Sequence, residues 1–136
     1  MRTVFADSHF YIAFLNPSDQ HYQAAQAMAA EAGRGIVTTD FVLIEILDGL
    51  SAPPLRARAV AFVRALKKSR STRVIAATPE LFEKALELYE RRLDKGRSFT
   101  DCASFVVMRD EGIMEALTGD FHFEQAGFRA LLRSVP

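Results

Sequence analysis

Four acidic residues that are far apart in the sequence each stand beside or within an apolar segment: Asp7, Glu45, Asp101 and Asp120. Carboxylates brought within roughly 5 Å of one another repel and raise each other's pKa values, so a folded protein keeps such a cluster when a divalent cation holds it. Hard oxygen ligands favour Mg²⁺, or Mn²⁺, over zinc. The three histidines and one cysteine form no HxxxH or CxxC pair. The chemistry expected of the four acids is therefore a divalent-metal site.

Each of three acids also has a structural alternative. Asp7 and Asp120 follow short apolar runs and could cap the helix that comes next, because Asp is a preferred N-cap residue. Asp101 ends the segment Ser98-Phe99-Thr100-Asp101, which has the spacing of a capping box. A helix start that is buried against a sheet would direct Asp101 into the same crevice as the other acids, so capping and metal binding are compatible.

Glu45 interrupts the segment Phe41–Leu47, which is apolar on nearly every face of a helix. We expect this helix to be buried all round, where an unpaired carboxylate would cost several kcal/mol. Glu45 is therefore expected either to belong to the metal site or to pair with a buried Arg or Lys. Asp48 lies one turn on and could share the face of Glu45, but it borders Gly49 near the expected exposed end of the helix.

Short β-like runs alternate with longer helical ones along the chain. Strands are expected at Thr3–Ala6, Ile36–Thr38, Arg73–Ala76 and Met114–Thr118, with an edge strand at Phe128–Leu132. Helices are expected at Ser8–Leu15, His21–Ala32, Asp40–Leu50, Pro53–Ser69, Pro79–Leu93 and Ser98–Met108. Strands separated by helices imply parallel pairing with right-handed crossovers. The expected fold is α/β, a three-layer α/β/α domain whose mainly parallel central sheet gathers ligands at the carboxyl ends of its strands.

The composition is that of one globular domain covering residues 1–136, with 49% hydrophobic and 25% charged residues. A single cysteine excludes an internal disulfide and fits a reducing cytoplasm, where we expect the protein. No apolar run approaches the roughly 18 residues of a membrane span, and Asp7 and His9 argue against a signal peptide. The apolar residues of the early helices are expected in the core: Tyr11, Phe14, Leu15, Leu47 and Leu50.

With 17 basic and 17 acidic side chains, any nucleic-acid surface must be local. One basic group directly precedes Asp101 and consists of Arg91, Arg92, Lys95 and Arg97; a second consists of Lys67, Lys68, Arg70 and Arg73. The first group could contact RNA phosphates because it is close to the expected site, or it could be a solvated helix end. His122 is close to Asp120 and could touch substrate, although a surface or packing role is the commoner one for a histidine.

Three segments resemble the PIN-domain ribonucleases, and in particular the VapC-like toxins of type II toxin–antitoxin systems. They are Val4–Ser8, Thr39–Glu45, and Ser98–Cys102 continued by Leu117–Phe123 with Gly127-Phe128 after it. The last is the most specific, and the resemblance covers residues 3 to about 132. It implies a PIN-like α/β/α fold and hydrolysis of an RNA phosphodiester that depends on Mg²⁺, with Mn²⁺ as a second possibility.

The resemblance also implies roles for individual residues. Asp7, Glu45, Asp101 and Asp120 form its acidic set; the three aspartates hold the metal, and Glu45 acts directly or through water. Ser8, Thr39, Ser98 and Thr118 are the supporting hydroxyls. Some relatives have a further acid one turn after the third, where this chain has Ser104, so we expect one firmly held metal; Asp40 is assigned no ligand role. The implied partners are RNA, a second copy of the chain and a cognate antitoxin peptide lying in a groove, with no membrane.

Two other functions fit parts of the sequence. A catalytically silent PIN-like module that binds RNA or a protein would keep the fold and the capping acids but would bind no metal. A phosphotransfer enzyme with an Asp nucleophile needs a second Asp two residues after the first, where this chain has His9. The sequence has no Gly-rich phosphate loop or GxGxxG, which leaves nucleotide-cofactor enzymes without support.

Overall fold

A parallel five-stranded sheet forms the centre of the computed structural model, which describes residues 2–31 and 33–134. In the order β3-β2-β1-β4-β5, neighbouring strands all pair in parallel. The strands are β1 (Arg2–Ala6), β2 (Arg34–Thr39), β3 (Thr72–Ile75), β4 (Glu115–Leu117) and β5 (Arg129–Ala130). The helices are α1 (Ser8–Leu15), α2 (Tyr22–Ala29), α3 (Asp40–Gly49), α4 (Pro53–Lys68), α5 (Pro79–Arg91), α6 (Phe99–Glu111) and α7 (Phe121–Gln125), followed by a 3-10 turn, η1 (Leu131–Ser134).

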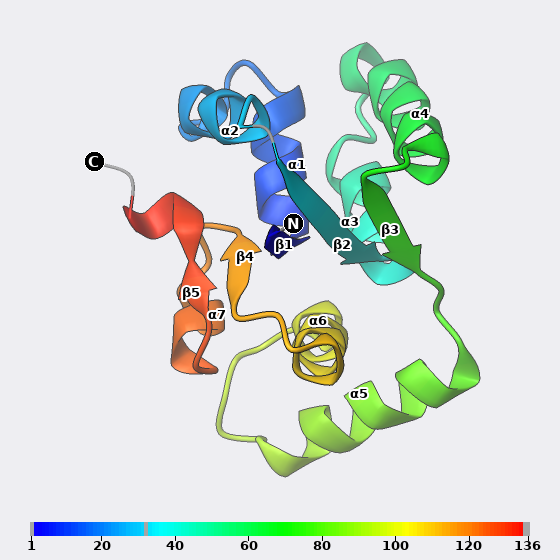
Figure 1. Cartoon of the computed structure of the whole chain (residues 1–136). Helices are drawn as coiled ribbons and strands as arrows, with labels where there is room; N and C mark the ends of the chain where they lie inside the picture. The colour runs from blue at the N-terminus through cyan, green and yellow to red at the C-terminus, as the bar shows by residue number, and fades with distance from the viewer. Residues whose placement is uncertain (1, 32, 135–136) are drawn as a thin grey trace.

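Helices cover both faces of the sheet, which confirms the predicted α/β/α fold. In Figure 1, α1, α2 and α4 lie above the sheet, and α6 lies below it with α5 packed beneath. The strand order reverses at β1, since β2 and β3 lie to one side of it and β4 and β5 to the other. In open parallel sheets, ligands bind at the carboxyl ends of the strands at such a point. The fold therefore directs attention to the residues that directly follow β1 and β4.

The expected elements are present, with differences at their ends. The first part of the expected edge strand is β5, but Leu131 and Leu132 belong to the 3-10 turn. Helix α2 ends at Ala29, and the expected end at Ala32 lies outside the described residues. Helix α6 runs past Met108 to Glu111, and its C-cap Gly112 has a left-handed φ of 68°. Helix α7 is not among the expected elements, because five residues are too few to show a helical period.

The expectation that the helix around Glu45 is buried all round is wrong. Helix α3 buries Val42, Leu43 and Ile46, but Ile44 is 52% exposed and Leu47 is 38% exposed. Its neighbours α1, α4 and α6 cover only part of its circumference. Of the five early apolar residues expected in the core, Tyr11, Leu15 and Leu50 are buried and Phe14 packs against the core, whereas Leu47 is exposed. Within the described ranges, no helix is both long and apolar enough to cross a membrane.

Candidate metal centre

Asp7 lies at the carboxyl end of the central strand β1 and is only 3% exposed. It precedes α1, but its side chain makes no capping hydrogen bond, so the capping alternative for Asp7 is wrong. Its Oδ2 instead accepts a hydrogen bond of 2.9 Å from the hydroxyl of Thr118, directly after β4. Its Oδ1 is buried and has no hydrogen-bond partner among the described residues. Burial, followed by repulsion from Asp101, raises the pKa of Asp7 to about 7.

Asp101 stands in the first turn of α6 and forms the expected capping box. Its backbone N–H donates to Ser98 Oγ over 3.0 Å, and the Ser98 N–H donates to Asp101 Oδ2 over 3.3 Å. Burial, followed by repulsion from Asp120, raises the pKa of Asp101 to about 6. The capping role therefore coexists with a place in a cluster of repelling acids.

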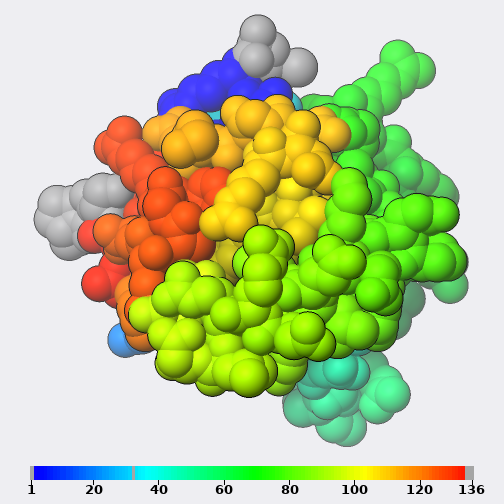
Figure 2. All heavy atoms as spheres, turned by 90° about the horizontal axis from the view of Figure 1, so that it is seen from below, coloured from blue at the N-terminus to red at the C-terminus, as the bar shows by residue number. Residues whose placement is uncertain are grey.

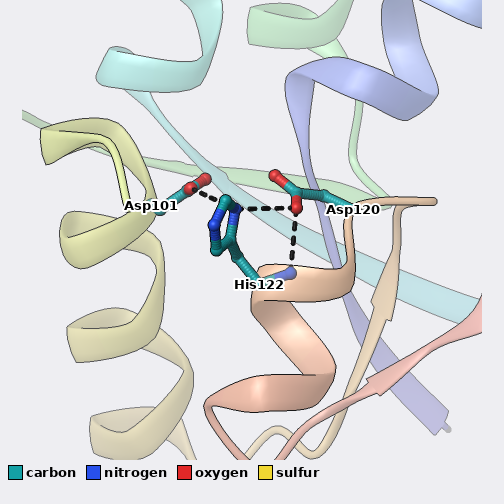
Figure 3. Close-up of side chains that lie close together, drawn as sticks. All are labelled: Asp101, Asp120 and His122. Carbon is teal, nitrogen blue, oxygen red and sulfur yellow. Dashed lines mark hydrogen bonds and ion pairs between the residues drawn. The ribbon is translucent and has the colours of Figure 1, made fainter. Parts of the chain in front are cut away.

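Asp120 and His122 lie together at the start of α7. Asp120 caps this helix, since the His122 N–H donates to its Oδ1 over 2.9 Å. The His122 ring reaches back, with Nδ1 3.0 Å from Asp120 Oδ1 and 4.0 Å from Asp101 Oδ2, and Figure 3 shows the ring between the two carboxylates. One ligand atom from each of these three residues lies within 4.8 Å of the others. His122 therefore contacts the acid cluster, and the sequence signal for this was its place two residues after Asp120; whether it touches substrate stays a prediction.

Glu45 projects from α3 toward the same cluster and is half-buried. Its Oε1 accepts a hydrogen bond of 2.7 Å from the hydroxyl of Ser8. It has no Arg or Lys partner in the described part of the chain, and its charge helps to raise the pKa of Asp7 and of Asp101. Neither Glu45 nor Asp7 is in the group of three formed with His122. Glu45 is more exposed than Asp7 and Asp101, which are buried, while Asp48 is exposed.

Two of the four expected supporting hydroxyls donate to a carboxylate of the acidic set: Ser8 donates to Glu45, and Thr118 donates to Asp7. The other two act as helix caps instead. The Ser98 hydroxyl accepts from the backbone N–H of Asp101, and Thr39 Oγ1 accepts from the Val42 N–H and caps α3. The residue before it, Thr38, is not among the expected set: its buried hydroxyl donates over 2.8 Å to the carbonyl of Ala6 and ties β2 to β1 just before Asp7.

Two neighbouring polar residues stay outside the cluster. Asp40 accepts from the Ala77 N–H, and its Oδ1 lies 3.7 Å from Lys67 Nζ. Ser104, one turn after Asp101, is fully buried, and its hydroxyl donates to the Thr100 carbonyl over 3.0 Å. The position at which some relatives carry a further acid is thus occupied by a hydroxyl bound to its own helix.

His9 holds the loop that carries Asp120. Its Nδ1 accepts a hydrogen bond of 3.1 Å from the Gly119 N–H. Burial, and then repulsion from His21, lowers the pKa of His9. The ring therefore acts as a neutral acceptor near neutral pH. A Cβ at Gly119 would lie 2.7 Å from His9 Cε1, so any other residue at this position requires the His9 ring or the loop to shift.

Replacing Gly119 by Ala is expected to displace either the His9 ring or the loop, and with it Asp120. The expected cost is about 1–3 kcal/mol of unfolding free energy and at least a tenfold loss of RNA cleavage. Thermal unfolding and a cleavage assay would measure these two effects. Gly96→Ala is the matched control, because nothing lies within 4 Å of the added Cβ. A Gly119→Ala variant as stable and active as the parent would contradict this role.

The basic residues before Asp101 are not equivalent. Arg91 and Arg92 are exposed. The Asp94 carboxylate contacts two cations: its Oδ1 lies 3.3 Å from Arg92 Nε, and its Oδ2 lies 3.8 Å from Lys95 Nζ. Arg97 is only 8% exposed, and its guanidinium lies 5.4 Å from the centre of the Phe105 ring. In the second basic group, Lys67 faces Asp40 and Arg73 pairs with Glu111. The two groups therefore differ in how their charge is neutralised.

The acid cluster suits a hard divalent cation. Asp7 carries a buried oxygen without a partner, and the repulsion that raises the pKa values of Asp7 and Asp101 is relieved when a cation lies between carboxylates. Carboxylate oxygens are the ligands that Mg²⁺ and Mn²⁺ prefer. Asp7, Asp101 and Asp120 are the residues that would hold the ion.

Comparison with known proteins places this site in a family. The sequence pattern of the PIN domain matches residues 4–129. The chain is 34% identical to the 23S rRNA-specific endonuclease VapC20 of Mycobacterium tuberculosis, over 92% of this chain and 95% of that protein. The crystal structure of VapC20, described as a Sarcin-Ricin loop cleaving toxin, superposes with a TM-score of 0.84 over the same shares of the two chains.

A more distant structure shares the fold alone. Rickettsia felis VapBC2, solved with a DNA fragment from its promoter, is 14% identical and gives a TM-score of 0.65, covering 94% of this chain and 96% of that one. The match to the PIN pattern and the identity to VapC20 both extend over nearly the whole length of the chain. The chain therefore belongs to the PIN-domain family, in which VapC20 is one of its relatives.

Proposed function

We propose that this chain is a metal-dependent endoribonuclease that hydrolyses a phosphodiester bond of ribosomal RNA, and that it is the toxin of a toxin–antitoxin pair. The observation that carries the proposal is the group of buried, mutually repelling carboxylates at the carboxyl edge of a PIN-domain sheet. The substrate class is taken from VapC20, the 23S rRNA-specific endonuclease to which the chain is 34% identical. The sarcin–ricin loop of the large ribosomal RNA is therefore the first substrate to test.

The contacts of each residue indicate the role that we propose for it. Asp7, Asp101 and Asp120 hold Mg²⁺ or Mn²⁺, and the Thr118 hydroxyl and the Ser98 N–H fix the orientation of two of these carboxylates. When bound, such an ion polarises the scissile phosphate and lowers the pKa of bound water toward neutrality.

Glu45 differs from Asp7 and Asp101, which are buried, because it is only half-buried. Its Oε1 accepts from Ser8, and its other oxygen, which has no hydrogen-bond partner among the described residues, can accept a hydrogen bond from a water and orient it toward the phosphate. Ser104 supplies no carboxylate beyond Asp101, so we propose one firmly held ion.

The partners proposed are an antitoxin peptide and a second copy of this chain. An apolar cavity of about 210 Å³ between α1, α2 and α4, whose lining includes Phe10, Phe14 and Phe62, supports the antitoxin groove. Exposed apolar side chains such as Phe82 and Leu86 on α5 support self-association.

The test of this function is cleavage of total RNA by the purified chain with Mg²⁺, with the cut ends mapped by sequencing. The proposal expects a small number of cut sites in the large ribosomal RNA and none when EDTA is present. Asp101→Asn is expected to produce none of these ends. Cleavage that persists in Asp101→Asn, or parent protein that leaves all RNA intact in Mg²⁺ and Mn²⁺, would refute the proposal.

A further inference from the structure

A small cationic pocket lies apart from the acid cluster, between the end of α5 and the start of α6. Its volume is about 80 Å³, and it is lined by Leu88, Tyr89, Arg92, Leu93, Lys95, Arg97 and Cys102. Figure 2 shows the end of α5 and the following loop, in yellow-green, at the surface of the molecule. The space is large enough for several water molecules, and therefore for a tetrahedral oxyanion.

Arg97 makes this pocket unusual. It is 8% exposed, its Nε is buried without a hydrogen-bond partner, and no acidic group pairs with it among the described residues. A buried cation without a counter-charge is costly, and its contact with the Phe105 ring offsets only part of that cost. Arg92 and Lys95 share a single acid, Asp94, which is not in the lining. Positive charge therefore exceeds negative charge at the pocket, which calls for an anion.

A phosphate group of RNA fits the remaining observations best. The planar guanidinium of Arg is suited to binding two phosphate oxygens at once. Tyr89 lines the pocket and is 46% exposed, so its ring offers a face on which a neighbouring base can stack. Arg97 is also only four residues before Asp101, which brings the pocket close to the acid cluster along the chain.

We propose that this pocket binds a phosphate of the RNA substrate away from the scissile bond, with Arg97 as its buried anchor. The inference rests on the proposed ribonuclease function, because it takes the ligand from that substrate. Each phosphate neutralised by a cationic side chain contributes about one to the slope of log Kd against log salt concentration. Arg97 is thus expected to contribute one such increment, while surface arginines that touch no RNA contribute none.

The test measures binding of a sarcin–ricin-loop RNA oligonucleotide in EDTA, across a series of KCl concentrations. Arg97→Met is expected to weaken binding about tenfold and to lower the salt slope by about one. Arg109→Met is the matched control, because this exposed arginine also lies over a phenylalanine ring, at 5.8 Å from Phe128. It is expected to leave both quantities at the parent values. An unchanged affinity and slope in Arg97→Met would overturn the proposal.

Arg97→Lys and inorganic phosphate distinguish an RNA-phosphate site from a structural role of Arg97, a free-anion site and a protein-binding site. The Lys variant keeps the charge, so it is expected to retain the salt slope that Arg97→Met loses; equal loss in both, together with a lower unfolding temperature, would show a structural role only.

Inorganic phosphate is expected to raise the unfolding temperature of the parent but not of Arg97→Met. If phosphate raises the unfolding temperature of the parent while Arg97→Met binds RNA as tightly as the parent, the pocket binds a free anion. If Arg97→Met loses affinity for an acidic peptide and not for RNA, it takes a protein partner; either result overturns the proposal.

Binding in EDTA does not depend on cleavage, so the two proposals can fail separately. Arg97-dependent binding by a chain that cuts no RNA would refute the nuclease and leave the pocket in place. Normal cleavage with no effect of Arg97 on binding would refute the pocket alone.

Discussion

Replacing Asp7 by Asn is expected to abolish RNA cleavage and, at the same time, to stabilise the metal-free protein. The loss of cleavage should be at least about a thousandfold, because the ion and its polarising effect are lost. The gain in stability follows from burial and from repulsion by Asp101, which raise the pKa of Asp7 from 3.8 to about 7. A pKa shift of that size corresponds to up to about 4 kcal/mol of unfolding free energy. The side-chain N–H₂ of the introduced Asn is buried without an acceptor, which costs part of this gain, so the expected net stabilisation is about 2 kcal/mol at pH 8.

The sign of this effect depends on pH. Because the pKa of Asp7 is higher in the folded than in the unfolded chain, the folded chain keeps this proton between the two pKa values while the unfolded chain releases it, so each rise in pH within that interval favours unfolding. The stability of the metal-free parent should therefore fall as the pH rises from about 4 to about 7, while the Asn variant lacks this contribution. Urea unfolding in EDTA at pH 5 and pH 8 would measure it.

Asp40→Asn provides the control for Asp7→Asn, because this acid also follows a strand of the sheet but binds Ala77 and Lys67 outside the cluster. It is expected to cleave RNA at the parent rate. An Asp7→Asn variant that is less stable than the parent at pH 8 in EDTA would contradict the described environment of Asp7. One that cleaves at the parent rate would contradict its role.

Divalent ions are expected to stabilise the parent strongly at pH 8 and weakly at pH 5. At pH 5 the carboxyls of Asp7 and Asp101, with pKa values of about 7 and about 6, are largely protonated in the folded chain and must release protons before an ion binds. At pH 8 an ion present at about 100 times its Kd adds about 2.7 kcal/mol, which raises Tm by about 10 °C.

Thermal unfolding with Mn²⁺ or with EDTA at the two pH values measures this difference. Asp7→Asn is expected to lose the Mn²⁺ effect at pH 8, and Asp40→Asn to keep it. A Tm shift that is equal at pH 5 and pH 8, or equal in the parent and Asp7→Asn, would show that the ion acts elsewhere than on the acid cluster.

The sequence was most informative where a general rule links chain position to space. Asp7 follows a central strand, and Asp101 carries a capping signature, so parallel-sheet topology and helix-start chemistry together placed both at one edge. Glu45 shows the limit of an apolar pattern. The run Phe41–Leu47 predicted burial on all sides, but the pattern does not say how many neighbours a helix has, and Ile44 remains 52% exposed.

Contacts between distant segments were out of reach of local patterns. His9 and Gly119 are joined by a hydrogen bond across 110 positions of the chain, and neither residue type alone predicts it. His122 lies in a helix of five residues, too short to show a period. Arg97 sits in a run of basic residues typical of a solvated helix end, and only the packing of α6 against its surroundings reveals that its side chain is buried.

The central claim is that the acid cluster holds a divalent cation, and direct counting of bound Mn²⁺ tests it without interference from traces of other nucleases. Loss of the free-ion EPR signal on adding protein at pH 8 gives the number of ions bound. One Mn²⁺ per chain is expected for the parent and none for Asp101→Asn at the same concentrations. A parent that binds no Mn²⁺, or an Asp101→Asn variant that binds it equally well, would contradict the metal site.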